Sequence, residues 1–101
     1  MVVMTTIGSI DDARLLAYQM VEQRLAACAQ IVGPIESIFR WKDAIDTANE
    51  WQVWFKTLDI HWTALEAAIK GLHHYECPEI MALPVSEVTP RYLDWLKAEL
   101  P

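Results

Sequence analysis

The sequence contains no apolar run near the roughly 20 residues that a membrane-spanning helix needs. Residues Met1–Ile7 lack the basic region and the small-residue cleavage site of a secretory peptide. The eight lysine and arginine residues are scattered, and the net charge is -6, which argues against a binder of nucleic-acid backbones. Cys28 and Cys77 form neither a disulfide framework nor a Cys-x-x-Cys pair. We therefore expect a cytoplasmic protein with reduced thiols and with no nucleic-acid or membrane partner.

The usual catalytic signatures are also absent. The chain has no glycine-rich phosphate loop, no nucleophile elbow and no His-Glu-x-x-His pair, so no enzymatic activity is predicted. A content of 53% hydrophobic and 22% charged residues excludes a disordered or fibrous chain. With 101 residues and no linker or repeat, residues 1–101 are predicted to form one domain. Five tryptophans are more than the thin core of such a domain is expected to hold.

Hydrophobic periodicity predicts alternating strands and helices. Short apolar or alternating segments predict strands at Met1–Ile7, Cys28–Trp41, Glu50–Thr57 and Glu79–Val85. Helical spacing predicts helices that start at Ser9, Asp59 and Thr89, each of which is expected to cap its helix. Gly33-Pro34 should bend the second strand, and the polar segment Lys42–Asn49 should be a hairpin loop. The order β-α-β-β-α-β with an added C-terminal helix predicts an α+β, ferredoxin-like sandwich.

The predicted central hairpin has large apolar groups on both faces. Because helices should cover only one face of the sheet, Ile38 and Trp54 are expected to lie in water in an isolated subunit. A contiguous exposed apolar patch usually marks an interface, which favours oligomerisation. In the alternative, Trp54 packs under the C-terminal helix.

The candidate chemistry lies mainly in the segment His73–Glu79. Imidazole and thiolate are good ligands for copper or zinc, so His73, His74 and Cys77 are candidate metal ligands. Spacing alone favours structural roles, with His73 at the end of a helix and Tyr75 in the packing. Glu50 and Lys56 are candidates for a polar cleft, but six residues of one strand separate them by roughly 20 Å. They could act together only with residues of another strand or subunit.

Five motifs, in the same order, resemble the CutA divalent-ion tolerance family. They are Arg24-Leu25-Ala26-Ala27-Cys28-Ala29, Ile38-Phe39-Arg40-Trp41, Glu50-Trp51-Gln52-Val53-Trp54-Phe55-Lys56-Thr57, His73-His74-Tyr75-Glu76-Cys77-Pro78-Glu79-Ile80 and Leu83-Pro84-Val85. The resemblance implies a ferredoxin-like subunit in a tight homotrimer, with hairpins pairing between subunits. It also implies binding of copper and related divalent ions, with no agreed enzymatic reaction.

This sequence departs from the family pattern at three places. Thr5 stands where the family often has a cysteine tied to copper binding, His74 replaces a proline, and the hairpin turn reads Trp41-Lys42-Asp43-Ala44. A neutral hydroxyl is a poor ligand for a soft ion, so weaker Cu(I) binding is expected than in relatives with the thiol.

Three functions are compatible with these residues. The favoured one is a trimeric, copper-binding protein of divalent metal tolerance, with His73 as main ligand and His74 and Cys77 as helpers. A second is a small-molecule binder or enzyme that uses an intersubunit cleft lined by Glu50, Lys56, Trp41 and Tyr75. A third is a scaffold that anchors or organises other proteins.

Overall fold

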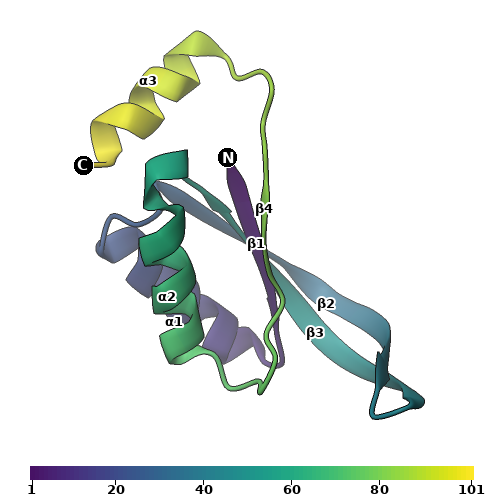
Figure 1. The fold of residues 1–101 in the computed structure, drawn as a ribbon. Coiled ribbons are helices and arrows are strands. Elements are labelled where there is room, and N and C mark those ends of the chain that lie inside the picture. Colours follow the sequence, from purple (N-terminus) through teal and green to yellow (C-terminus); the bar gives the residue numbers. More distant parts are fainter.

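The computed structural model describes all residues 1–101 as a four-stranded antiparallel sheet with helices against one face (Figure 1). The strand order is β2-β3-β1-β4, and the order along the chain is β-α-β-β-α-β followed by a helix. The elements are β1 (Val2–Ile7), α1 (Ile10–Glu22), β2 (Cys28–Trp41), β3 (Ala44–Lys56), a 3-10 turn (Asp59–His61), α2 (Trp62–Leu72), β4 (Ile80–Leu83) and α3 (Pro90–Glu99). The predicted ferredoxin-like α+β fold is confirmed.

One of the three predicted helix caps is confirmed. Ser9 caps α1, because its side-chain oxygen accepts a 3.1 Å hydrogen bond from the backbone N–H of Asp12. The prediction that Asp59 caps the second helix is wrong. Asp59 begins a 3-10 turn instead, and α2 starts after it without a side-chain cap. Thr89 precedes α3 but makes no capping hydrogen bond, and Pro90 occupies the first turn.

The β2–β3 hairpin is longer than predicted. The segment Lys42–Asn49 is not a loop, because β3 already begins at Ala44. The turn consists only of Lys42 and Asp43, with φ of 50° and 64°, the pair of positive φ angles that suits a two-residue hairpin turn. Polar composition suggested a loop, but a hairpin that projects into solvent tolerates polar side chains along its strands (Figure 1).

The predicted bend in β2 is confirmed. The pairing of β2 with β3 shifts between Val32 and Ile35, so that Gly33 and Pro34 form a bulge opposite Trp51. A Cβ atom on Gly33 would lie 2.5 Å from Cδ1 of Trp51, so only glycine lets this ring lie against the backbone.

The core is small for the number of apolar residues. Only 17 of 101 residues are buried, and a cluster that includes Val3, Leu16, Phe55 and Leu65 fills the space between the sheet and the helices α1 and α2. None of the five tryptophans is buried, as expected from the size of the chain. Apolar side chains that a subunit leaves exposed are available for contacts with other molecules.

Helix α3 lies beyond one end of the sheet rather than over its open face (Figure 1). Leu96 and Leu100 are buried, and Nε2 of His61 lies 3.1 Å from the carbonyl oxygen of Pro101. Burial, reinforced by the neighbouring Cys28 thiol, raises the pKa of Tyr92. No helix of the chain is long and apolar enough to cross a membrane.

Candidate functional site

The segment that follows α2 is attached to β1 through His73. Nε2 of His73 lies 2.7 Å from the carbonyl oxygen of Thr6, so this nitrogen carries the proton and donates it. Nδ1 is then the acceptor of a 3.1 Å hydrogen bond from the backbone N–H of Tyr75. The backbone N–H of His73 also ends α2 by donating to Ile69. Both ring nitrogens therefore have partners within the chain, and His73 has a positioning role.

Tyr75 joins this segment to the hairpin. Its hydroxyl donates a 2.8 Å hydrogen bond to Oε2 of Glu50, a side chain that is only 6% exposed. The ring of Tyr75 lies 4.8 Å from that of His73. Burial, reinforced by the hydrogen bond to Glu50 and by its negative charge, raises the pKa of Tyr75 to about 12. Tyr75 is therefore protonated at neutral pH and acts as a donor to Glu50.

The other two candidate metal ligands lie at the surface, on either side of Tyr75 in the chain. His74 is exposed and lies 3.7 Å from Oδ2 of Asp12, and Cys77 is exposed. Thr5, at the position of the family cysteine, is fully buried, and its hydroxyl donates a 2.6 Å hydrogen bond to the carbonyl oxygen of Glu79. No three side chains of the His, Cys, Asp or Glu type come together in a way that could hold a metal ion. His73, His74 and Cys77 therefore do not fit one shared metal site within a subunit, and their assignment as ligands stays a prediction.

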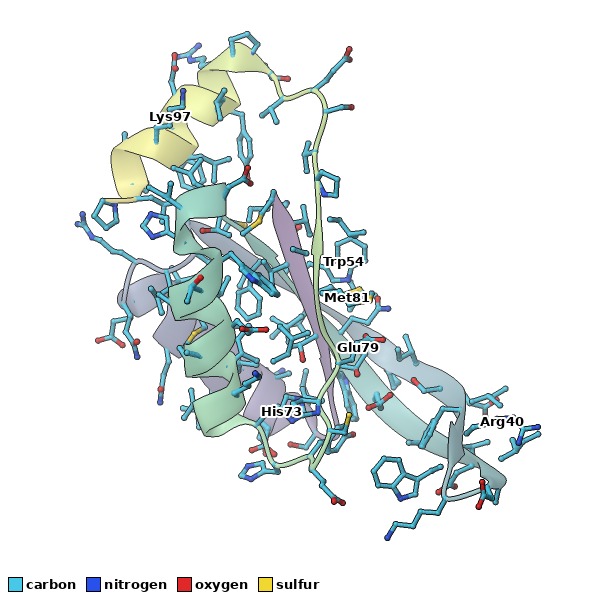
Figure 2. All side chains as sticks on the ribbon, in the orientation of Figure 1. Arg40, Trp54, His73, Glu79, Met81 and Lys97 are labelled. Atoms are coloured by element: carbon cyan, nitrogen blue, oxygen red, sulfur yellow. The ribbon has the colours of Figure 1, made fainter.

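Three of the four predicted cleft residues share a pocket of about 880 Å³ between the hairpin and the segment after His73. Glu50, Tyr75 and Trp41 line it together with Glu79 and with Arg40, which Figure 2 shows far out on the hairpin. Lys56 is absent, because it lies at the opposite end of β3 and donates to the side-chain oxygen of Gln30. A cleft that unites Lys56 with Glu50 across subunits stays a prediction.

The sequence analysis did not assign Phe39 and Asp46 to this pocket, although both line it. Phe39 and Asp46 are cross-strand partners, and Trp41 follows two residues later on the same face. The alternation of Phe39 and Trp41 was visible in the sequence. The position of Phe39 opposite Asp46 could not be predicted from the sequence. It depends on a two-residue turn, whereas the sequence predicts a longer loop.

The face of the sheet away from the helices is open and carries large apolar side chains among polar ones. Trp54 and Met81 lie on this side in Figure 2, and the register brings both next to Met4 of the central strand β1. Trp54 does not pack under α3, contrary to the alternative considered from the sequence. Ile38 is 67% exposed, and its cross-strand partner is Thr47. Thr47 and Trp54 are seven residues apart in β3, so their side chains point to opposite faces of the strand. Ile38 and Trp54 therefore lie on opposite faces of the hairpin, and each face has an unpartnered apolar group.

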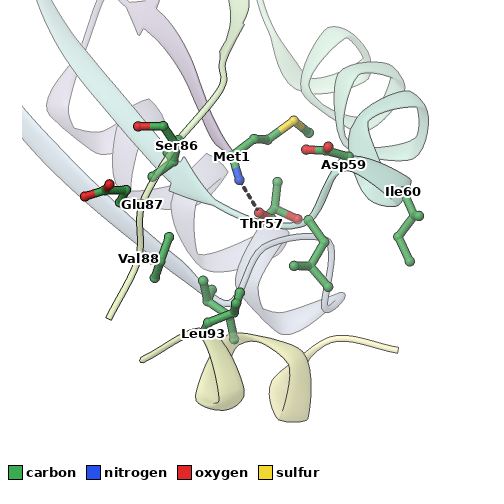
Figure 3. A pocket seen from close by; sticks show the side chains of 11 residues that line it. Met1, Thr57, Asp59, Ile60, Ser86, Glu87, Val88 and Leu93 are labelled. Atoms are coloured by element: carbon green, nitrogen blue, oxygen red, sulfur yellow. Dashed lines mark hydrogen bonds between the residues drawn. The ribbon is translucent and has the colours of Figure 1, made fainter. Parts of the chain in front are cut away.

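A second hollow, of about 740 Å³, lies between α3 and the start of β1 (Figure 3). The N-terminal ammonium of Met1 donates a 2.9 Å hydrogen bond to the carbonyl oxygen of Thr57 at its edge. Its lining is mostly apolar and includes Leu93 and Leu96 of α3. It holds none of the residues that the sequence predicts as metal ligands or cleft residues.

The fold and the motifs together define a small ferredoxin-like subunit with a long projecting hairpin, and comparison with known proteins assigns it to a family. The sequence profile of the CutA1 divalent ion tolerance protein matches residues 1–99. The chain belongs to this family, and the resemblance seen in the sequence is confirmed.

Individual relatives are similar over nearly their whole length. The divalent-cation tolerance protein CutA of Thermus thermophilus is 42% identical over 96 residues, which cover 95% of this chain and 93% of that protein. The Escherichia coli protein of the same name is 34% identical over 99 residues, covering 98% of this chain and 88% of the relative.

Solved structures of two relatives have the same fold. The T. thermophilus protein superimposes with a TM-score of 0.96 at 40% identity, covering 99% of this chain and 97% of that one. The CutA1 structure from Oryza sativa also has a TM-score of 0.96, at 34% identity, with 99% and 92% coverage.

Proposed function

We propose that this protein acts in the tolerance of divalent metal ions as a homotrimer that binds copper and related ions. Family membership supports the link to divalent cations, since relatives over the whole chain are named for divalent-cation tolerance. The charge pattern and the lack of a catalytic signature support a cytoplasmic protein that catalyses no reaction and binds no nucleic acid.

The observation that carries the assembly is the open face of the sheet. Trp54 and Met81 lie on it without a covering layer, while Ile38 is exposed on the other face of the projecting hairpin. Strand β2 is also a 14-residue edge strand with no partner on its outer side. Natural proteins rarely leave such an edge and such a face in water, so contacts between copies would cover both. Light scattering should give three times the 11.6 kDa of the chain, and a stable monomer would overturn the assembly.

For the metal, the structure favours a weak site at the exposed donors His74 and Cys77. Coordination by His73 would break its hydrogen bonds to Thr6 and Tyr75, whereas the other two side chains are accessible. Cu(II) should bind more tightly than Zn(II) or Co(II), because the affinity of divalent ions peaks at copper. Affinity should fall with decreasing pH, because protons compete for imidazole and thiolate.

Titration calorimetry with Cu(II) tests this assignment. Cys77→Ser and His74→Ala should each weaken binding, and the control variant His61→Ala, at the opposite end of α2, should not. If His73→Gln weakens binding most, His73 is the main ligand, as inferred from the sequence, and the structure-based choice of donors is wrong. A parent protein that takes up no copper at all would refute metal binding.

A further inference from the structure

The pocket of about 880 Å³ beside the hairpin has an excess of negative charge. Its carboxyl residues are Asp46, Glu50, Glu76 and Glu79, whereas Arg40 is the only lysine or arginine among the lining residues. Acidic side chains on a surface are ordinary, and their number alone does not define a site. The burial of one of them is the unusual feature.

Glu50 is 94% removed from solvent, yet no cation of the chain pairs with it. The carboxylates that lie within 4.0 Å of a basic side chain are Asp11, beside Arg14, and Asp12, beside His74. Oε2 of Glu50 accepts the hydrogen bond from Tyr75, while no side chain or backbone group donates to Oε1. No buried side-chain oxygen of the chain lacks a hydrogen-bond partner, so Oε1 must be open to the pocket, where a cation gains strong electrostatic attraction to the carboxylate.

Tyr75 cannot supply the missing positive charge. A phenol carries no positive charge in either protonation state, and its one proton is already donated to Glu50. Lys56, the lysine on the same strand, is directed to Gln30 at the far end of β3. No positively charged side chain of the subunit therefore pairs with Glu50.

The walls of the pocket favour an organic cation over a metal ion. Phe39 and Trp41 of the hairpin and Tyr75 of the opposite segment are aromatic, and about 40% of each side chain is exposed. Aromatic faces attract ammonium groups and pack against apolar ligands. A hard divalent ion needs several oxygen ligands at once, and no three suitable donors converge here.

We propose that this pocket binds a small protonated amine with an apolar or aromatic body, whose ammonium group pairs with Glu50. The aromatic side chains Phe39, Trp41 and Tyr75 contact the body, and the hydrogen bond from Tyr75 holds the carboxylate toward the pocket. His74 and Cys77, the proposed copper donors, also line this pocket, but neither is needed to bind the amine, so the proposal goes beyond metal tolerance and does not depend on it.

Benzylamine, with benzyl alcohol as its uncharged control, tests the proposal on the full-length protein after metal removal with a chelator. Calorimetry should detect saturable binding of benzylamine, and at least about tenfold weaker binding of benzyl alcohol, since the ion pair with Glu50 is lost. Glu50→Gln should weaken benzylamine binding by a similar factor. Glu22→Gln, a matched change on the outside of α1, should leave it unchanged.

Phe39→Ala provides a second variant, because Phe39 is 40% exposed and its removal spares the hydrogen bond between Tyr75 and Glu50. It should weaken the binding of benzylamine and of benzyl alcohol alike. Equal affinity for the two compounds, or unchanged benzylamine affinity in Glu50→Gln, would overturn the proposal. The proposal would also be overturned if the parent protein does not bind benzylamine and Glu50→Gln dissociates the assembly. Glu50 would then pair with a neighbouring copy of the chain. Copper binding is measured separately, so its failure would not affect this result.

Discussion

The hydroxyl of Thr5 donates a 2.6 Å hydrogen bond to the carbonyl oxygen of Glu79. Thr5 is completely buried in the central strand β1, and Glu79 is the residue before β4. The bond thus fixes the end of the segment that carries His73, Tyr75 and Cys77. Thr5 therefore has a structural role in this chain.

Replacing Thr5 by valine should destabilise the protein by about 1–3 kcal/mol, because the carbonyl of Glu79 loses its donor while the shape of the side chain is kept. Chemical denaturation of the two proteins measures the difference. Thr63→Val, the same change at an exposed position of α2, should alter the free energy of unfolding by less than about 0.5 kcal/mol. Equal effects at the two sites would show that the hydrogen bond contributes nothing.

Trp54→Glu should prevent assembly. If Trp54 is covered by a second copy, the substitution buries a carboxylate without a partner and costs several kcal/mol at each contact. The mass from light scattering should drop from three chains to one. Tyr18→Glu, an equivalent change at the 77% exposed residue of α1, should leave the mass unchanged. A Trp54→Glu protein that keeps the mass of three chains would place the interface elsewhere.

The fold could be predicted largely from the sequence, because its signals are local. Short apolar and alternating segments indicated β1 and β2, and Ser9 indicated the start of α1. The prediction of a hairpin loop at Lys42–Asn49 was wrong, because the turn Lys42-Asp43 depends on backbone angles that neither residue type favours strongly.

The site was less predictable, because its contacts join distant parts of the chain. Tyr75 and Glu50 are 25 residues apart, and nothing in either motif indicates that their side chains meet. His73 stood out as a metal ligand by residue type alone. Its role depends on two hydrogen bonds, to Thr6 and Tyr75, that only the packed structure reveals.

Tyr75 should make stability depend on alkaline pH. Its pKa is about 12 in the folded protein and 10.0 without perturbation, so folding favours the protonated phenol. This contribution is complete below pH 10 and is lost as the pH rises from about 10 to about 12, where the unfolded chain loses the proton first. Urea denaturation should therefore show a steeper decline over this range for the parent than for Tyr75→Phe. Parallel declines would contradict the shifted pKa.

Gly33 and Gly71 should respond in opposite directions to alanine. At Gly33, a methyl group would lie 2.5 Å from Cδ1 of Trp51 and 3.1 Å from the carbonyl oxygen of Glu50, so ring and strand must move. Such overpacking costs about 1–3 kcal/mol. At Gly71, near the end of α2, no atom lies within 4 Å of the added methyl. There alanine should raise stability by up to about 1 kcal/mol, because it restricts the unfolded chain and favours the helix.

Denaturation of both glycine variants beside the parent measures the two free energies of unfolding. Because Gly33 lies opposite the strand that carries Glu50, Gly33→Ala should also weaken the hydrogen bond between Glu50 and Tyr75. Its decline in stability between about pH 10 and about pH 12 should then be shallower than that of the parent. If Gly33→Ala is as stable as Gly71→Ala, the bulge accommodates a side chain and the close approach of Trp51 does not require glycine.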